Sequence, residues 1–546
     1  MRLKEEEREA LLAVARSVVQ EGKLFAVCAY GSKVAGYARP DSDYDIVVVA
    51  TDFGEGVRYR YVEGPVPASA LVVDRQLLMQ DATSSFLGEF VVGRLLNVYE
   101  PLLNGEAFRE AELRYKERVV AEALYELASD YGEFSRSILI PYDYFLFDKL
   151  KKRSMVYPPA LYSYVMTYAG PLGPDNRRSS LDGFREAAKA LVSRGYATAR
   201  EDCLMIAADK LKGDSFTKLL TIFSLTTRGV AQYAVHGYAG RVGLNVFRKE
   251  ALSKLKRMRE RPDPPPELER PRSLLRLEEG RFIADLSELK DYLASLAGLK
   301  EYTAREESLG EPYTTTRVLT FTSGKTSASF VVKNFSDVRS LKWAILSVWA
   351  LTARKFSMAP LARLEREYAA TRRLREAGVR VPRVIAVAPD ERTMVKEFVE
   401  GPTLTSRIDS IFSGDDTPLR DVEDYGALLS RVHSANLALG DSKANNVVIS
   451  AEGLCLTDLE QATEGGDFAW DIAEFLYYSA KLSLNGGRME KVARAFLEGY
   501  CRSGDRSLLA RSRGIKYLAP FQPFLSPGMS GMIRGLLDEY SQPLLA

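Results

Sequence analysis

The chain has 546 residues and a net charge of +2, and its 46% hydrophobic and 27% charged residues are typical of a globular protein. It is too long for one hydrophobic core, so we expect two to four domains. The 4 cysteines lie far apart and there are only 2 histidines, which excludes a CxxC zinc knuckle and an imidazole-rich metal site. Carboxylates must then do most of the chemistry, and their hard oxygens favour Mg²⁺ or Mn²⁺.

The N-terminal residues are charged and helical in character, unlike a signal peptide. No run of about 18 apolar residues occurs, so we expect no membrane span. The cysteines show no disulfide pattern, so we expect a cytoplasmic protein.

Residues 1–105 predict an α/β domain. Apolar residues at helical spacing predict a helix over 3–21, which Gly22 ends. Short apolar runs then predict three strands, over 24–30, 45–50 and 71–78.

Residues 106–258 are expected to form a helical domain that holds the substrate or acceptor, with its clearest helices over 110–128 and 182–193. Clustered basic residues and many tyrosines leave two explanations open. Either they contact RNA by charge and stacking, or they form a solvated face with tyrosines packed at a domain interface. The residues concerned are Lys149, Lys151, Lys152, Arg153, Arg177, Arg178, Tyr142, Tyr144, Tyr157, Tyr162 and Tyr164.

Residues 259–272 read RERPDPPPELERPR, and five prolines with dense charge predict an extended linker. Residues 273–546 change to a pattern of strands followed mainly by helices. They predict a hairpin, a long helix, two further strands, and short strands near 447 and 455. The hairpin, helix and two strands are expected at 317–322 with 327–335, at 361–377, at 383–388 and at 393–398.

A first candidate site lies in the segment AYGSKVAGYARPDSDYDIVVV, residues 29–49. Asp43 and Asp45 are two apart where a strand begins, so they project to one side and can hold two divalent ions for displacement at phosphorus. Gly31 lets the backbone approach a phosphate, and Ser32 with nearby amides binds its oxygens. The alternative is a solvated turn, because such acidic clusters are common at turns.

This segment resembles the polymerase-β-type nucleotidyltransferases, most closely the kanamycin-nucleotidyltransferase and MNT-type members. In that family a third carboxylate comes from a later strand, and Asp74 in ALVVDRQLL is the match. The resemblance implies that Asp43, Asp45 and Asp74 ligate the metals and that Asp74 helps deprotonate the attacking hydroxyl. It also implies transfer of a nucleoside monophosphate from an NTP, ATP in the first instance, to a hydroxyl of a small molecule, RNA or protein.

A second candidate site begins at LGDSKANNVVI, residues 439–449. Asp441 can accept a hydroxyl proton, while Asn446 and Asp458, in LTDLEQA, can hold Mg²⁺ on the phosphates. Lys333 ends the apolar strand SFVVK, where it can grip the phosphates. Glu367, on the predicted helix, can pair with Lys333 and fix it.

The order of these residues resembles the protein-kinase superfamily, and is similar to RIO-type and tRNA-modification-associated atypical kinases and to aminoglycoside kinases. The resemblance implies that ATP donates its γ-phosphate to a hydroxyl with Asp441 as base, and that Lys443 contacts phosphate. It places Glu397 to Val399 of MVKEFVEGPTL at the adenine. It also implies that Asp471, in GGDFAWDIAEF, braces the catalytic-loop backbone, in a two-lobed domain over 273–546 of a multidomain α+β protein.

Three features depart from the kinase pattern: Leu439 replaces a histidine, the metal triplet reads Asp-Leu-Glu, and the loop near Ser308 to Glu311 has one glycine. The segment SGKTS at 323–327 is not a P-loop, because Leu319 stands where that motif needs glycine; it predicts a hairpin turn. Two alternatives to a double enzyme remain. The C-terminal half is a regulatory nucleotide-binding module, or the chain is an RNA-binding assembly factor that binds through residues 106–258.

Overall fold

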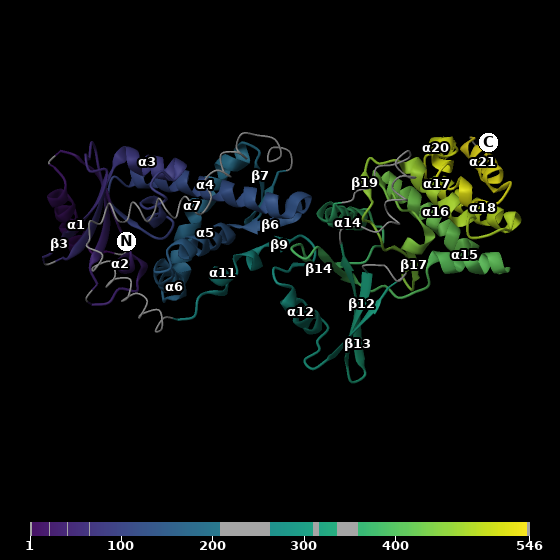
Figure 1. Cartoon of the computed structure of the whole chain (residues 1–546), viewed down its shortest axis with the longest axis horizontal. Coiled ribbons are helices and arrows are strands. Elements are labelled where there is room, and N and C mark those ends of the chain that lie inside the picture. The colour runs from purple at the N-terminus through teal and green to yellow at the C-terminus, as the bar shows by residue number, and fades with distance from the viewer. Residues whose placement is uncertain are drawn as a thin grey trace. The chain divides into compact units, whose positions relative to one another are not determined.

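The structure is a computed structural model that describes residues 3–20, 22–40, 42–64, 66–207, 262–309, 316–335 and 359–542 (Figure 1). The chain divides into two compact units. The first takes in Met1–Asp130 and Ile138–Arg276, and the second takes in Tyr131–Ser137 and Leu277–Ala546. Within the described residues, no helix combines the length and the apolar character that crossing a bilayer requires.

The first unit is built on a five-stranded sheet in which β2 and β4 are parallel and the other neighbours are antiparallel. The strands, in sheet order, are β3 (Val57–Val62), β4 (Ala68–Asp74), β2 (Tyr44–Ala50), β1 (Leu24–Tyr30) and β5 (Glu100–Leu103). Helix α1 (Glu5–Val18) packs on this sheet through Leu11 and Ala15, which are fully buried. The predicted first helix and first two strands are therefore confirmed.

The third predicted strand is shifted. Residues 71–78 were expected to be one strand, but β4 ends at Asp74 and α3 (Arg75–Ser84) begins directly after it. The cause is local, because the side chain of Asp74 accepts a hydrogen bond from the Gln76 amide at 2.8 Å and so caps the helix.

Between this sheet and residue 207, where the described part of the middle region ends, the chain forms the helices α4 (Gly105–Tyr131), α5 (Tyr142–Val156), α6 (Ala160–Ala169) and α7 (Gly173–Ser193). A small sheet accompanies them, in which β8 (Cys203–Ile206) pairs with β6 (Ile138–Pro141) and β7 (Ala197–Arg200). The middle region is mainly helical as expected, and its last part, residues 208–258, lies outside the described residues.

The proline-rich segment is not an extended spacer over the part that the structure describes, residues 262–272. Helix α11 (Pro266–Glu269) packs against α5, and Leu268 is buried. Arg177 forms an ion pair with Glu267 at 3.0 Å, and Lys151 donates to the carbonyl oxygen of Glu269 at 2.7 Å. One apolar side chain and two polar contacts therefore outweigh the composition, and the unit boundary falls at Arg276.

The second unit begins with a six-stranded sheet that carries the predicted hairpin. Its strands, in sheet order, are β10 (Arg281–Phe282), β14 (Val384–Ala388), β15 (Thr393–Glu397), β13 (Thr326–Asn334), β12 (Thr316–Ser323) and β11 (Thr303–Ser308). Ser323 pairs with Thr326, so SGKTS is a hairpin turn as predicted. Helices α12 (Leu289–Leu296) and α14 (Pro360–Glu376) accompany this sheet, which has its own small core.

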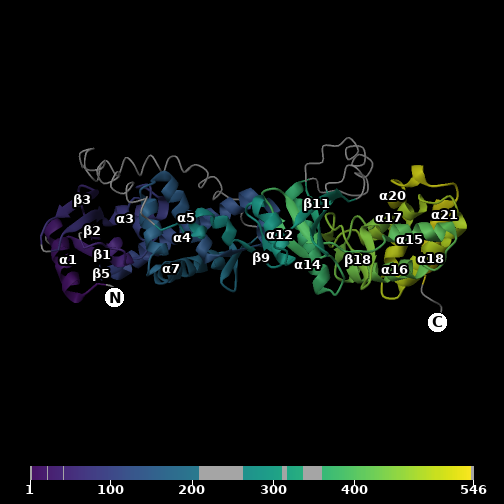
Figure 2. The same cartoon turned by 90° about the horizontal axis from the view of Figure 1, so that it is seen from below.

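A second, larger core lies in the helical part that follows (Figure 2). Its helices are α15 (Leu404–Ser413), α16 (Leu419–Ser434), α17 (Phe468–Ala480), α18 (Gly486–Cys501), α19 (Arg506–Ser512), α20 (Ile515–Leu518) and α21 (Met529–Ser541). Two short antiparallel pairs join them: β16 (Leu437–Ala438) with β19 (Thr463–Glu464), and β17 (Val447–Ser450) with β18 (Gly453–Leu456). The two cores give the second unit a smaller sheet lobe and a larger helical lobe.

Residues Tyr131–Ser137, which end α4 and form a short 3-10 helix, belong to the second unit. The ring of Phe134 meets Tyr368 edge-on at 5.7 Å between centroids, and Tyr131 meets Phe282 at 5.8 Å. Ser137 donates to the carboxylate of Glu365 at 3.0 Å. This segment, called here the docking segment, therefore covers one side of α14.

Candidate active sites

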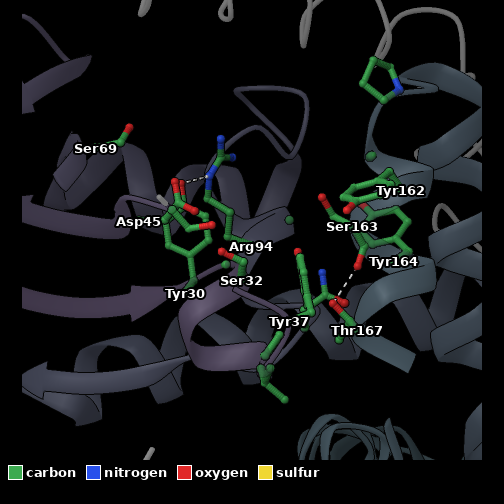
Figure 3. Close-up of a pocket in the computed structure, with 18 of the residues that line it drawn as sticks. Tyr30, Ser32, Tyr37, Asp45, Ser69, Arg94, Tyr162, Ser163, Tyr164 and Thr167 are labelled. Carbon is green, nitrogen blue, oxygen red and sulfur yellow. Dashed lines mark hydrogen bonds between the residues drawn. The ribbon is translucent and has the colours of Figure 1, made fainter. Parts of the chain in front are cut away.

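The first site is a cavity of about 710 Å³ in the first unit (Figure 3). Asp45 opens β2 beside Tyr30, its antiparallel partner at the end of β1. Asp45, in β2, and Asp43, which lies just before β2, both line the cavity. Figure 3 shows Tyr162, Ser163 and Tyr164 of α6 on the side opposite Asp45.

The position of the Asp45 side chain leaves no room for a side chain at residue 31, which is glycine. Its φ is +79°, and it precedes α2 (Ser32–Ala35) as the N-cap residue. A Cβ at this position would collide with Oδ2 of Asp45. Only glycine lets the carboxylate lie against the Gly31-Ser32 turn, and Ser32 itself lines the cavity. The expected grouping of Gly31, Ser32, Asp43 and Asp45 is thus present.

Asp74 does not join this group, and its assignment as third metal ligand and base is wrong. In the parallel pairing of β2 with β4, Asp45 lies opposite Ser69, whereas Asp74 lies opposite Ala50 at the other end of the strand. Five residues of strand separate the two positions by about 16 Å. Asp74 instead accepts hydrogen bonds from the amides of Phe53 and Gln76.

The two remaining carboxylates still suit a hard divalent cation, because Asp43 and Asp45 both offer oxygen donors to the cavity. Ser69 lies opposite Asp45 on β4 and lines the cavity. The residue of β4 that is nearest to Asp45 in the sheet is therefore this serine and not Asp74.

Two arginines line the cavity: Arg94, which was not foreseen, and Arg153, which was predicted only as a member of the basic cluster. Arg94 donates to the hydroxyls of Tyr30 at 3.1 Å and Tyr59 at 2.6 Å. Arg153 donates to Glu89 and to Tyr164, both at 3.1 Å. Each is separated from its partners by many residues, so no local pattern signals it.

The loop that carries Glu89 is fixed by a buried aspartate. Asp81 is fully buried and accepts hydrogen bonds from four backbone amides, those of Leu87, Glu89, Val91 and Val92. Glu89 in turn pairs with Arg118, Lys149 and Arg153. This network shapes the cavity wall.

The basic cluster and tyrosines of the middle region mostly face the protein. Lys149, Lys152, Arg153 and Arg177 form ion pairs with acidic residues of the same unit. Tyr142 and Tyr144 are buried, and the others line the cavity, namely Tyr157, Tyr162 and Tyr164. Tyr142 and Tyr144 therefore fit the packed explanation, whereas the three tyrosines that line the cavity leave the choice between the two explanations open, and residues 208–258 lie outside the described part.

The second site is organised around Lys333, which comes from β13. Its Nζ lies 2.7 Å from Oε2 of Glu367 on α14, so the expected pair is present. The same nitrogen lies 2.9 Å from Oδ1 of Asp458 and 3.1 Å from Oε2 of Glu460. Burial opposes the charge of Asp458, but Lys333 outweighs it and holds the pKa of that carboxyl at about 2. Lys333 thus ties the sheet lobe to the segment after β18.

Side chains of α17 accept hydrogen bonds from the backbone of the loop that carries Asp441. Asp471 is fully buried and accepts hydrogen bonds from the amides of Leu439 and Gly440, both at 2.7 Å, so it braces the loop as expected. Glu474 accepts from the amide of Ser442 at 2.9 Å. His433 is buried, and its Nε2 lies 3.2 Å from Oδ2 of Asp471, so its contacts support a structural role.

Asp441, Lys443 and Asn446 are close together. Nζ of Lys443 lies 2.5 Å from Oδ1 of Asp441, and the side-chain amide of Asn446 donates to the carbonyl oxygen of Asp441 at 3.0 Å. The amide of Thr457 donates to the carbonyl oxygen of Asn446 at 2.9 Å, which brings Asp458 next to this loop. Carboxylate and amide oxygens suit Mg²⁺, so Asp458 and Asn446 fit the expected cation.

The segment expected at the adenine leaves the end of β15. Glu397 pairs with Arg383 at 3.2 Å, and Val399 follows it on the way to α15. The glycine-poor loop follows β11, where the Leu309 amide donates to Thr316 at 3.0 Å. Residues 310–315 of that loop lie outside the described residues.

Two charged residues of this site were missed. Lys396 of β15 binds Glu367, and Glu460 pairs with Lys333 and, at 3.3 Å, with Arg363. The available signal for Lys396 was a lysine inside an otherwise apolar strand.

No family model matches the chain. A curated protein, the EKC/KEOPS complex subunit BUD32 of Encephalitozoon cuniculi (strain GB-M1), is 38% identical over 86 residues, which are 16% of this chain and 41% of that protein. The chain therefore matches less than half the length of that relative. Among solved structures, WaaP in complex with acyl carrier protein is similar at a TM-score of 0.26 and 13% identity, over 46% of this chain and 93% of that one. Aminoglycoside phosphotransferase APH(4)-Ia is similar at 0.25 and 13%, over 47% and 98%.

The chain is thus similar to a kinase-like protein over part of its length, and the contacts of Lys333 with Glu367 and Asp458 in the second unit agree with the kinase-like order of residues predicted from the sequence. The TM-scores of the two structural likenesses are too low to carry weight in assigning a function. None of these relatives is named as a nucleotidyltransferase, so that resemblance of the first unit stays a prediction.

Proposed function

We propose that the second unit binds ATP with Mg²⁺ and transfers the γ-phosphate to an acceptor hydroxyl. The observation that supports this most is the contact of Lys333 with both Glu367 and Asp458. It joins a lysine suited to phosphates with a carboxylate suited to the metal, before any ligand is bound. A bound Mg²⁺ would neutralise charge on the β- and γ-phosphates.

The residues of the catalytic loop have separate roles in this proposal. Asp441 accepts the proton of the acceptor hydroxyl, on a backbone that Asp471 and Glu474 hold. Burial opposes the charge of Lys443, but Asp441 raises the pKa of its ammonium, so it stays protonated and can contact phosphate. Asn446 and Asp458 hold the metal.

The test uses release or transfer of label from γ-labelled ATP. Asp441→Asn should lower transfer about 100- to 10,000-fold, because a positioned base is lost. Lys325→Met is the matched control, since Lys325 is exposed in the hairpin turn. Undiminished transfer by Asp441→Asn would contradict the proposal and favour the regulatory nucleotide-binding module.

We propose as a second function that the first unit transfers a nucleoside monophosphate from an NTP. The observation that favours it is the pair of Asp43 and Asp45 on a cavity wall against the Gly31-Ser32 turn. In this proposal Asp43 and Asp45 hold the metal, and Ser32 with adjacent amides contacts phosphate. Arg94 and Arg153 add positive charge to the cavity wall.

Label from α-labelled ATP tests this second function. The double variant Asp43→Ala, Asp45→Ala should lose transfer of α-label and keep transfer of γ-label. Persistent α-labelling by the double variant would show that the site is misassigned. Incubation with a cytoplasmic extract would reveal whether the acceptor is a small molecule, RNA or protein, and strongly salt-dependent RNA binding would instead favour an assembly factor.

A further inference from the structure

Lys396 is a buried lysine to which the proposed phosphotransfer gives no role. It lies on β15 and is 3% exposed. Lysines are rarely buried, because taking an ammonium group out of water is costly unless it is paired. Its place in the middle of the sheet lobe therefore has to be offset by specific partners.

Those partners belong to the kinase-like site. Nζ of Lys396 binds Oε1 of Glu367 and donates to the carbonyl oxygen of Thr457 at 2.6 Å. Lys333 binds the other oxygen of Glu367, at 2.7 Å. Each oxygen of this carboxylate therefore has its own lysine.

The register of the sheet explains the arrangement. On β13 and β15, Val331 is paired with Lys396 and Lys333 with Met394. Val331 and Lys333 are two apart, so they face the same side, and residues opposite each other in a ladder share that side. The two lysines are therefore diagonal neighbours on adjacent strands, on the face of the sheet that is turned toward Glu367.

The two lysines differ in what else they contact. Lys333 also contacts Asp458, the residue proposed to take the metal, so its partners change when nucleotide binds. The second partner of Lys396 is a backbone carbonyl, that of the residue just before Asp458. This carbonyl is not among the groups proposed to bind metal or phosphate, so Lys396 can hold Glu367 while Lys333 exchanges Asp458 for phosphate.

We propose that Lys396 is a positioning residue, which fixes Glu367 and the Thr457 carbonyl so that Lys333 and Asp458 keep their alignment on bound nucleotide. This role rests on the proposed phosphotransfer. It predicts a defect in turnover more than in nucleotide binding, because alignment matters most in the transition state.

The kinetic test compares Lys396→Met with Lys396→Arg, and uses Lys325→Met as control, by release of phosphate from γ-labelled ATP. For Lys396→Met we expect kcat to fall about 10- to 100-fold with a change in KM for ATP of less than about threefold. Lys396→Arg should restore most of the activity, because it keeps the charge. A kcat of Lys396→Met within about twofold of the unchanged chain would overturn the proposal.

A double-mutant cycle in unfolding, without nucleotide, tests the contact itself. Trp470 is buried in the helical core of the second unit, so its fluorescence follows the unfolding of that unit. Lys396→Met should cost less in a Glu367→Gln background, by about tenfold in the unfolding equilibrium constant, and additive effects would overturn the proposal.

The two tests also separate the inference from the function on which it rests. If the unchanged chain neither releases the γ-label nor transfers it to any component of a cell extract, the proposed phosphotransfer fails, and the cycle alone then decides whether Lys396 holds Glu367. If Lys396→Met does not fold, Lys396→Gln takes its place in both tests, because it keeps a donor for Thr457 without the charge. Lys396→Gln is expected to lose turnover as Lys396→Met does.

Discussion

The two candidate sites hold their carboxylates in different ways. In the second unit, each oxygen of Glu367 is bound by a lysine before any ligand arrives. In the first unit, Asp43 and Asp45 line a cavity, and their places are set by strand register and by Gly31. The first arrangement depends on charge pairs and the second on backbone geometry, so they should fail under different substitutions.

The largest contrast is expected from removing one carboxylate in each site. Glu367→Leu leaves two buried ammonium groups short of a partner and should lower the free energy of unfolding of the second unit by about 3–5 kcal/mol. Asp43→Asn changes an exposed side chain and should stay within about 0.5 kcal/mol. Urea unfolding measures both, followed by tryptophan fluorescence for the second unit and by far-UV circular dichroism for the first. Equal losses would remove the distinction between the sites.

A pH effect of a few kcal/mol is expected at Glu474. Burial, and then Asp441, raise the pKa of this carboxyl to about 8. The folded chain keeps the proton up to that pH while the unfolded chain releases it near 4.5, so the stabilisation is complete below pH 4.5 and is lost as pH rises to 8. Glu474→Gln cannot ionise and should flatten this fall in the unfolding free energy by a few kcal/mol.

The exposed Glu376, changed to Gln, is the matched control for this pH series. It should leave the pH dependence of tryptophan-detected unfolding as it is in the unchanged chain. An unaltered slope in Glu474→Gln would mean that this carboxyl ionises normally in the folded protein.

A smaller loss is expected at Gly31, where geometry rather than charge is at stake. Gly31→Ala places a Cβ against Asp45 at a φ of +79°, which costs about 1–2 kcal/mol for the backbone and displaces the carboxylate. Transfer of α-label should fall while transfer of γ-label is kept. Gly22→Ala is a matched control, because its φ is +78° and its Cβ would meet nothing within 4 Å. Equal effects on α-labelling would show that only strain matters.

The smallest effect is expected at Asp74. Asp74→Ala removes a helix cap and should cost about 1 kcal/mol in the unfolding free energy of the first unit. It should leave transfer of α-label within about twofold, because Asp74 lies at the far end of β4 from Asp45. A loss of α-labelling as large as that of Asp45→Ala would restore Asp74 to the site.

The residues that the sequence could identify are those with a local signal. Lys333 follows a run of apolar residues, and Asp441 and Asn446 lie five residues apart in one loop. These short-range patterns were enough to predict them as site residues. Lys396 also lies in a largely apolar strand, but its partner Glu367 and the partner of Glu460 lie far along the chain, so the sequence does not indicate their roles. The partners of Arg94, and the place in the cavity of Arg153 from the basic cluster, likewise depend on contacts far along the chain.

The errors have the same origin. The sequence shows that Asp45 and Asp74 lie near the ends of strands, but it does not show at which edge of the sheet each one lies. The parallel pairing of β2 with β4 places them at opposite edges. In the proline-rich segment, composition predicted a spacer, but burial of Leu268 and the ion pair of Glu267 decided the outcome. Strand pairing and burial depend on tertiary contacts, which a short stretch of sequence does not reveal.

The docking segment means that the kinase-like half is not a self-sufficient module. A gene split at residue 276 would encode a protein whose Tyr368 and Phe282 had lost their aromatic partners and whose Glu365 had lost Ser137. Because Tyr368 and Glu365 lie on the same helix as Glu367, the damage would reach the lysine-paired carboxylate. We therefore expect a second unit that is produced without residues 131–137 to be less stable than the same unit in the whole chain.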